Sequence, residues 1–259
     1  MPRFAANLTT MFTEVDFLDR FAAAAGAGFK GVEFLFPYAD DKEKLAERLR
    51  ANDLVQVLHN FPAGDWDAGD RGIACHPDRI DEFREGVGQA VDYATTLGCA
   101  RLNCLAGIAP AGAAPERLRE TFVANLGFAA GVLAEAGITL LTEPINTRDI
   151  PGFYLTGTDQ AIAIIDDVAA PNLALQYDVY HMQVMEGDLA PTIERHLDRI
   201  GHIQISDTPG RNEPGTGEIN YPFIFDHLDR LGYQGWVGCE YKPRAGTAEG
   251  LGWARPYLA

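Results

Sequence analysis

Eight short apolar runs recur along the chain, separated by longer segments with helical spacing. Most runs have five or six residues and are nearly continuous in apolar character, as strands buried on both faces of a sheet require. Alternation of such strands with helices predicts a parallel α/β architecture. The runs are Phe4–Leu8, Val32–Phe34, Leu54–His59, Arg101–Leu105, Ile138–Glu143, Leu173–Asp178, His202–Ser206 and Trp236–Glu240.

The segments between these runs carry helix signals. Pro115 suits the first turn of a helix, where its missing N–H leaves no hydrogen bond unmade. Glycines that follow helical patterns predict C-caps at Gly26, Gly98, Gly137 and Gly232. The expected helices are Asp16–Ala25, Asp41–Arg50, Pro77–Leu97, Pro115–Ala136, Thr158–Val168, Ala190–Arg199, Tyr221–Leu231 and a tail from Gly246.

The length of the chain fits one closed barrel. It has 259 residues, and a (β/α)₈ barrel typically takes about 250 as one domain. We therefore predict an α/β protein with a single (β/α)₈ TIM barrel over residues 1–259. A doubly wound open sheet is the main alternative. Its dinucleotide-binding form is disfavoured because no G-x-G-x-x-G motif follows the first run.

Charge and composition exclude several classes of function. The chain has 21 Lys and Arg against 37 Asp and Glu, a net charge of −16, which opposes nonspecific binding to nucleic acid. It does not exclude a small anionic substrate, since one arginine or metal ion can reverse the local field. No run approaches the roughly 18 apolar residues of a membrane span, and no signal peptide is evident. Four cysteines without a CxxC pair suggest reduced thiols and a cytoplasmic protein. A homo-oligomer remains compatible with the sequence.

Three acidic residues each end an apolar run, at Glu143, Asp178 and Glu240. Side chains at the carboxyl ends of barrel strands point into the active-site mouth, so these acids are expected to crowd one site. Their mutual repulsion calls for a cation. Carboxylate oxygens, with an amide oxygen from Gln204 on the intervening strand, favour Mg²⁺ or Mn²⁺. Any one of these acids alone could equally be a helix N-cap or a surface residue. The prediction of a metal site therefore rests on their occurrence together at consecutive strand ends.

Several segments resemble the hydroxypyruvate isomerase family of xylose-isomerase-like TIM barrels. The resemblance runs from Arg3 to about Trp253 and is specific in combination, although a single piece such as EPxN is shared with ketose 3-epimerases. The segments are Thr142–Asn146 (TEPIN), Gln176–His181 (QYDVYH), Asn212–Asn220 (NEPGTGEIN), Gly238–Pro243 (GCEYKP), His59–Trp66 (HNFPAGDW) and Gly69–Cys75 (GDRGIAC).

The resemblance implies roles for the strand-end residues. Glu143, Asp178, Gln204 and Glu240 fall on the family's metal-binding positions, and Glu143 and Glu240 also fall on its acid/base positions. The implied reaction interconverts hydroxypyruvate and 2-hydroxy-3-oxopropanoate by proton transfer through an enediol. Many ketose 3-epimerases have His where this chain has Gln204, which favours the isomerase group.

Other functions stay open at this stage. A 2-oxo-tetronate isomerase would use the same apparatus with a longer pocket, and a ketose 3-epimerase would take a neutral sugar. The apurinic endonuclease branch of the fold would need more histidine ligands and a basic face. A noncatalytic carbohydrate-binding barrel would have no need of two matched acids.

A three-carbon acid offers little apolar surface, so charge must carry its recognition. Arg211 could clamp a carboxylate with its planar fork, and Lys242 could attract it as a point charge. Arg71 is a third candidate, although an ordinary surface cation is the favoured interpretation there. His59 closes its run and His181 lies three residues beyond Asp178. A lone histidine is more often structural, but this placement at strand ends favours contact with the substrate. Trp66 could cover the substrate or anchor its own loop. The residues expected to bind substrate are therefore His59, Trp66, His181, Arg211 and Lys242.

The run Asp207–Asn220 is too rich in turn residues for a plain strand-to-helix link. Long loops of this kind are often functional. We interpret it as a rigid loop on the substrate side that carries Arg211.

Overall fold

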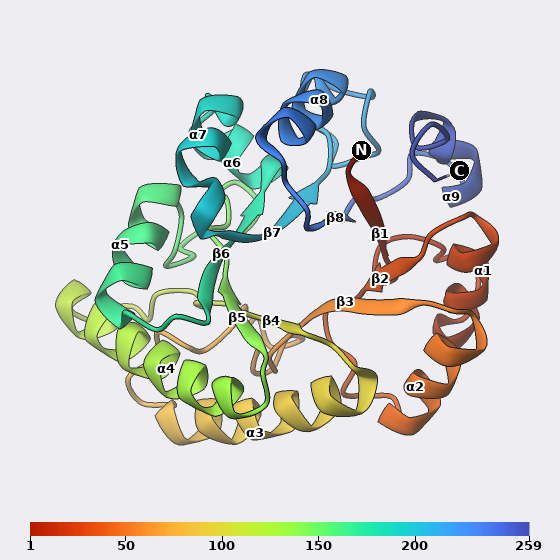
Figure 1. The fold of residues 1–259 in the computed structure, drawn as a ribbon. Helices are drawn as coiled ribbons and strands as arrows, with labels where there is room; N and C mark the ends of the chain where they lie inside the picture. Colours follow the sequence, from red (N-terminus) through yellow and green to blue (C-terminus); the bar gives the residue numbers. More distant parts are fainter. Residues whose placement is uncertain (259) are drawn as a thin grey trace.

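The chain folds into a closed parallel barrel, seen end-on in Figure 1. The computed structural model describes residues 1–258. Each strand pairs with the next, and the first pairs with the last, so the predicted TIM barrel is confirmed and the open sheet is wrong. The strands are β1 Arg3–Asn7, β2 Gly31–Glu33, β3 Val55–Asn60, β4 Arg101–Cys104, β5 Thr139–Thr142, β6 Leu173–Asp178, β7 Ile200–Ile205 and β8 Trp236–Cys239.

Helices surround the barrel on its outer side. They are α1 Arg20–Gly26, α2 Lys42–Ala51, α3 Ile80–Leu97, α4 Pro115–Glu135, α5 Thr158–Val168, α6 Val179–Met185, α7 Leu189–His196, α8 Tyr221–Leu231 and α9 Thr247–Gly250. Short 3₁₀ turns at Phe17–Asp19, Leu197–Arg199 and Leu251–Trp253 adjoin α1, α7 and α9.

Most predicted helix ends lie within one residue of the observed ends, and the larger differences are at Asp16, where α1 begins only at Arg20, at Pro77, and at Arg199, where α7 ends at His196. Gly98 and Gly232 are left-handed C-caps. The C-cap of α4 is Ala136 rather than the predicted Gly137, which comes next and has a positive φ. The cap at Gly26 is wrong, because α1 includes that residue and the chain reverses at Gly28 (φ +100°). The start of α3 at Pro77 is wrong because the first residues form a turn and the helix begins at Ile80. Helix α6 was not predicted at all.

Helix α6 follows β6 without an intervening loop. Asp178 ends the strand, and its Oδ1 accepts hydrogen bonds from the backbone N–H groups of Tyr180 (2.8 Å) and His181 (3.4 Å). The carboxylate is therefore an N-cap as well as a strand-end acid. This cap turns the chain sharply, so that His181 comes from the first turn of α6.

Two apolar layers frame the barrel. The larger fills the space between strands and helices, where every second strand residue points outward. The smaller lies inside, with Ala5, Val57, Leu58 and Leu141 buried together. Above this inner plug the interior side chains become polar, and they form the floor of the candidate site.

No helix within residues 1–258 is long and apolar enough to cross a membrane. All four cysteines are buried free thiols.

Candidate active site

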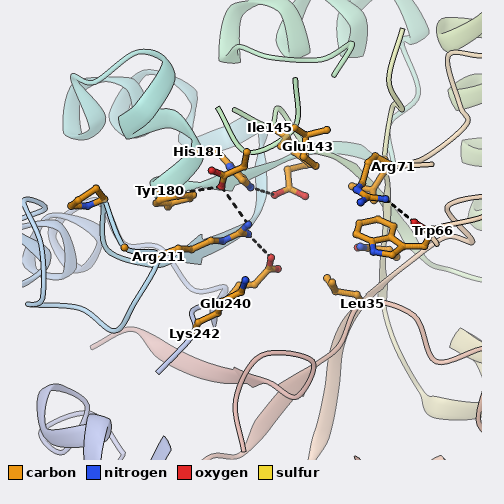
Figure 2. Close-up of a pocket in the computed structure, with 16 residues that line it drawn as sticks. Leu35, Trp66, Arg71, Glu143, Ile145, Tyr180, His181, Arg211, Glu240 and Lys242 are labelled. Atoms are coloured by element: carbon orange, nitrogen blue, oxygen red, sulfur yellow. Dashed lines mark hydrogen bonds and ion pairs between the residues drawn. The ribbon is translucent and has the colours of Figure 1, made fainter. Parts of the chain in front are cut away.

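A cavity of about 480 Å³ opens at the carboxyl ends of the strands, and its lining includes Glu143 and Glu240 (Figure 2). Glu143 follows β5 and Glu240 follows β8, and both side chains are nearly buried. The expectation that distant strand ends place these two acids at one site therefore agrees with the geometry. In the close-up they face the cavity from different sides.

Asp178 completes an acidic cluster with Glu143 and the imidazole of His181. One candidate ligand atom from each of these three residues lies within 4.8 Å of the other two. His181 Nε2 is 3.6 Å from Asp178 Oδ2 and 3.9 Å from Glu143 Oε1. On the other side of the ring, Nδ1 lies 2.6 Å from the Asn146 side-chain amide.

Amide side chains from the strands hold one oxygen of each glutamate. Glu143 Oε2 accepts from Asn103 and Gln176, both at 2.9 Å. Glu240 Oε2 accepts from Gln204 at 2.7 Å and from Asn7 at 3.2 Å. Each carboxylate is thus pinned at one oxygen and presents the other toward the cavity.

Gln176 and Gln204 also join the two halves of this network. Gln176 Nε2 donates to Gln204 Oε1 at 2.6 Å. In this orientation Gln204 turns its amide nitrogen toward Glu240 and its oxygen toward Gln176. The Gln204 oxygen that is predicted to bind a metal therefore already accepts one hydrogen bond, from Gln176, and keeps its second lone pair.

A buried carboxylate, Glu33, lies below the network in the barrel interior. It accepts from Gln204 at 2.7 Å and from Asn7 at 3.1 Å. His202 Nε2 lies 2.8 Å from its other oxygen. A Cβ at Gly238 would fall 2.3 Å from this carboxylate, so the glycine makes the space in which Glu33 lies.

Burial and like charge act together on the acids. Burial, reinforced by the negative charges of Glu240 and Asp178, raises the pKa of Glu143 well above its ordinary value. Burial likewise raises the pKa of Glu240, against the lowering effect of Arg211. Such shifts suit groups that must take and return protons near neutral pH.

Arg211 supplies positive charge to the cluster. Its Nη2 lies 2.7 Å from Glu240 Oε1 and 3.9 Å from Asp178 Oδ2, and its Nη1 lies 3.7 Å from Asp149. The guanidinium also stacks over the Tyr180 ring at 5.2 Å. Arg211 therefore lines the cavity as expected, but three carboxylates already surround it.

The loop that carries Arg211 is organised around one buried carboxylate, Asp207. Its Oδ1 accepts from the backbone N–H groups of Thr208 (3.0 Å) and Ile219 (3.1 Å), and its Oδ2 from those of Gly215 and Gly217 (both 2.9 Å). A Cβ at Gly217 would meet the Thr208 carbonyl oxygen at 1.9 Å. The loop therefore has a polar core of its own, as its turn-rich sequence suggested.

The remaining residues expected to bind substrate divide into two groups. Trp66, His181 and Lys242 line the cavity. His59 is not among its lining residues, and its fully buried ring stacks on Phe34 at 6.3 Å. Burial lowers the pKa of His59 to about 3, which keeps it neutral. The position therefore offers His59 no direct path to a ligand in the cavity.

Several cavity residues received no role from the sequence, and two of them lie beside Arg211. They are Tyr180 and Asp149, both in contact with Arg211. Arg71, interpreted as a surface cation, lines the cavity next to Trp66 (Figure 2). Tyr180 OH donates to Asp149 Oδ2 at 2.9 Å. Tyr180 lies on α6, the helix that begins directly after Asp178. Because the sequence did not predict this helix, Tyr180 was given no role.

The donor set fits a hard divalent cation. Asp178 Oδ2 is buried and has no hydrogen-bond partner within residues 1–258, and it faces the Glu143–His181 pair. An unpartnered buried carboxylate oxygen is costly unless a cation or proton joins it. Three acids whose pKa values are all raised by burial indicate the same need for positive charge.

Asp178→Asn is expected to stabilise the metal-free protein by about 1 kcal/mol, a rise of roughly 2–4 °C in Tm. Burial raises the pKa of Asp178, although Arg211 and two backbone N–H groups lower it. The native ionised form is therefore disfavoured, and asparagine retains the Oδ1 that caps α6. A group with a raised folded pKa stabilises at acid pH and loses that contribution as the pH rises. The gain should therefore be largest at neutral pH and vanish in acid.

Thermal unfolding in chelator, followed by addition of Mg²⁺ or Mn²⁺, measures this effect. The wild type is expected to gain Tm when the metal is added, and the variant should lose this gain. Asp67→Asn is the matched control, because Asp67 is exposed and makes no ion pair within the described chain. A variant less stable than the wild type without metal would contradict the prediction.

Comparison with known proteins agrees with this architecture. Residues 21–257 match the model of the xylose isomerase-like TIM barrel family. The chain is 56% identical over 257 residues to a hydroxypyruvate isomerase of Escherichia coli, covering 99% of this chain and 100% of that protein. It is 53% identical over 258 residues to a 2-oxo-tetronate isomerase of Cupriavidus necator, covering 100% and 99%.

Solved structures show the same fold. A crystal structure described as an AP endonuclease, family 2, from Brucella melitensis matches with a TM-score of 0.98 and 49% identity, over 99% of each chain. A D-allulose 3-epimerase from Methylomonas matches at a TM-score of 0.75 and 24% identity, over 93% of this chain and 85% of that chain, a likeness of fold alone. The chain belongs to the xylose isomerase-like TIM barrel family, and its full-length similarity places it among the isomerases of the hydroxypyruvate isomerase group.

Proposed function

We propose that the protein interconverts hydroxypyruvate and 2-hydroxy-3-oxopropanoate, with Glu143 and Glu240 as the acid/base pair. The observation that carries the proposal is the matched setting of these two glutamates. Each has one oxygen fixed by two amide donors and the other turned toward the same cavity. The names of the full-length relatives support this substrate class.

The reaction moves one proton from C3 to C2 and a second from the C3 hydroxyl to the C2 oxygen. Glu143 Oε1 has no hydrogen-bond donor within residues 1–258 and lies 3.9 Å from His181 Nε2, which supports its proposed role as acceptor of the C3 proton. Glu240 Oε1 is held by Arg211, and its proposed role is proton transfer at C2 or at the C2 oxygen. A raised pKa keeps either glutamate a competent acid after it has taken a proton.

His181 is placed to donate a hydrogen bond to a substrate oxygen. Asn146 Oδ1 accepts from the Asp149 backbone N–H at 2.7 Å, so its Nδ2 faces His181 Nδ1. The imidazole proton then lies on Nε2, the nitrogen directed at the acids. Burial, together with Arg211 and Arg148, lowers the pKa of His181, which keeps the ring neutral. A neutral donor can stabilise the enediol oxygen without itself losing a proton.

A divalent metal, Mg²⁺ or Mn²⁺, belongs to the same proposal, with Glu143, Asp178, Gln204 and Glu240 as its ligands. When bound, it would polarise the substrate carbonyl and stabilise negative charge on the enediol oxygen. The unpartnered Asp178 Oδ2 supports a cation at this position.

Proton NMR in D₂O tests the reaction directly. Chelator-treated protein should convert hydroxypyruvate only after Mg²⁺ or Mn²⁺ is added, and the product should carry deuterium at C2. Conversion without metal would contradict the assigned role of the cation, while leaving the isomerase activity in place. Absence of conversion under every condition would overturn the proposed substrate.

The same assay with other substrates distinguishes the alternatives. A 2-oxo-tetronate isomerase would convert the four-carbon acid in preference to hydroxypyruvate, and a ketose 3-epimerase would convert neutral ketoses. The similar Brucella protein is described as an AP endonuclease. A net charge of −16 opposes binding of a phosphate backbone, so no cleavage of an abasic-site duplex is expected here.

A further inference from the structure

Arg71 lies in the loop between β3 and α3 and lines the cavity beside Trp66 (Figure 2). Its guanidinium stacks over the Trp66 ring, with the central carbon 4.1 Å from the ring centroid. Nη1 donates to the carbonyl oxygens of Trp66 (3.0 Å) and Asp70 (2.6 Å). The side chain is therefore held by its own loop rather than extended into solvent.

No carboxylate pairs with Arg71 anywhere in residues 1–258, although its loop is rich in aspartate. Asp70 is already occupied by Arg79 at 2.8 Å and by the Asp65 backbone N–H at 2.7 Å. Asp65 accepts from the Ala68 backbone N–H at 3.0 Å. In a protein of net charge −16, an arginine in the catalytic cavity without an acidic partner marks a place for an anion.

The unused part of the guanidinium has the right shape for a carboxylate. Only Nη1 donates within the described chain, which leaves Nε and Nη2 available as a parallel pair of donors. This edge binds a carboxylate with two hydrogen bonds, which a lysine cannot do. The stack on Trp66 fixes the plane of the fork, so less freedom is lost when an anion binds.

The backbone of the loop is shaped to hold this position. Gly72 has φ +98°, and its N–H donates to the Ala63 carbonyl at 3.0 Å. A Cβ at Gly72 would lie 2.4 Å from the Leu105 carbonyl oxygen. The residue next to Arg71 can therefore be only glycine at this close approach, and the arginine is presented to the cavity from a fixed point.

The other two cations of the cavity suit a carboxylate less well. Arg211 has Glu240, Asp178 and Asp149 within 4 Å, so its charge is already compensated. Lys242 is exposed and is a point charge at the cavity edge. In Figure 2, Arg71 and Trp66 lie across the cavity from Arg211, with the two glutamates between them.

We infer that Arg71, stacked on Trp66, binds the carboxylate of the substrate and selects acids over neutral sugars. The inference rests on the proposed function, in which the substrate is a small 2-oxo acid. The reacting carbons would then lie at Glu143 and Glu240, and the carboxylate would point away from Arg211 toward the fork of Arg71.

Arg71→Gln and Arg71→Lys test this role by steady-state kinetics with hydroxypyruvate and saturating Mg²⁺. Arg71→Gln should raise KM about 100-fold, with kcat changed less than about threefold, because two charge-assisted hydrogen bonds are lost. The KM of Arg71→Lys should lie between those of the wild type and Arg71→Gln, because lysine keeps the charge but lacks the two parallel donors. Arg84→Gln is the matched control. Arg84 stacks on Phe128 at 5.0 Å outside the cavity, and its variant should behave as wild type.

Calorimetric binding of glycerate, a non-reacting 2-hydroxy acid, separates this inference from the proposed function. Wild-type protein should bind glycerate, and Arg71→Gln should bind it about 100-fold more weakly. If the wild type binds glycerate through Arg71 but does not convert hydroxypyruvate, the proposed function fails and the anion site stands. Wild-type KM in Arg71→Gln, a kcat loss without a KM change, or no glycerate binding by wild type would each overturn the inference.

Discussion

Glu143→Gln and Glu240→Gln are each expected to lower kcat for hydroxypyruvate by about 10²–10⁴-fold, the usual contribution of a positioned acid or base. Glutamine preserves the oxygen that accepts two amide hydrogen bonds in each case, so the network below the site should survive. What is lost is the proton-accepting oxygen that faces the cavity. Kinetics in D₂O, with deuterium wash-in followed by NMR, measure the loss.

Glu218→Gln is the matched control for these two variants. It lies on the Asp207–Asn220 loop, is exposed, and accepts one hydrogen bond from Gln183 at 3.3 Å. It should turn over at the wild-type rate. The double variant should be little worse than the poorer single variant, because two groups that act in one proton transfer are not additive. Near-wild-type kcat in either single variant would remove that residue from the pair.

Asp207→Asn is expected to destabilise the protein by about 2–4 kcal/mol, because four backbone N–H groups donate to its two oxygens. Asparagine keeps one acceptor oxygen. Its NH₂ group would replace the other oxygen and face two backbone N–H groups, from which it cannot accept hydrogen bonds. The loop should lose its polar core, and Arg211 its fixed position beside Glu240. Activity should therefore fall well below what the loss of stability alone accounts for.

Urea unfolding and kcat/KM at a temperature far below Tm separate the two effects of this variant. Asp226→Asn, an exposed residue of α8, removes the same charge and should change neither quantity by much. If Asp207→Asn were as stable as wild type, the loop would be held by contacts other than this carboxylate.

The barrel was predictable because strands buried on both faces leave a strong pattern. All eight apolar runs coincide with observed strands, and no predicted strand end differs from the observed end by more than two residues. Helix α6 escaped because no turn residue separates it from β6. A single aspartate both ends the strand and caps the helix, and propensity along the chain cannot show that double use.

The site was predictable only in its outline. Strand-end position brought out Glu143, Asp178, Gln204 and Glu240, because the fold itself gathers those positions. It could not show which polar side chains meet beneath them, such as Gln176 with Gln204 or Glu33 with His202. Those pairs depend on register around the barrel. It also could not show that the His59 ring packs on Phe34, or that Arg71 lines the cavity while the backbone of its own loop holds it.

The order of the site residues along the chain has a consequence for synthesis. The ligand candidates come from β5, β6, β7 and β8, and the last of them, Glu240, follows the strand that must pair with β1. The proposed four-residue cation site would therefore stay incomplete in a growing chain until its final strand leaves the ribosome and pairs with β1. A metal held by all four residues would stabilise the closed barrel and not the earlier stages of folding.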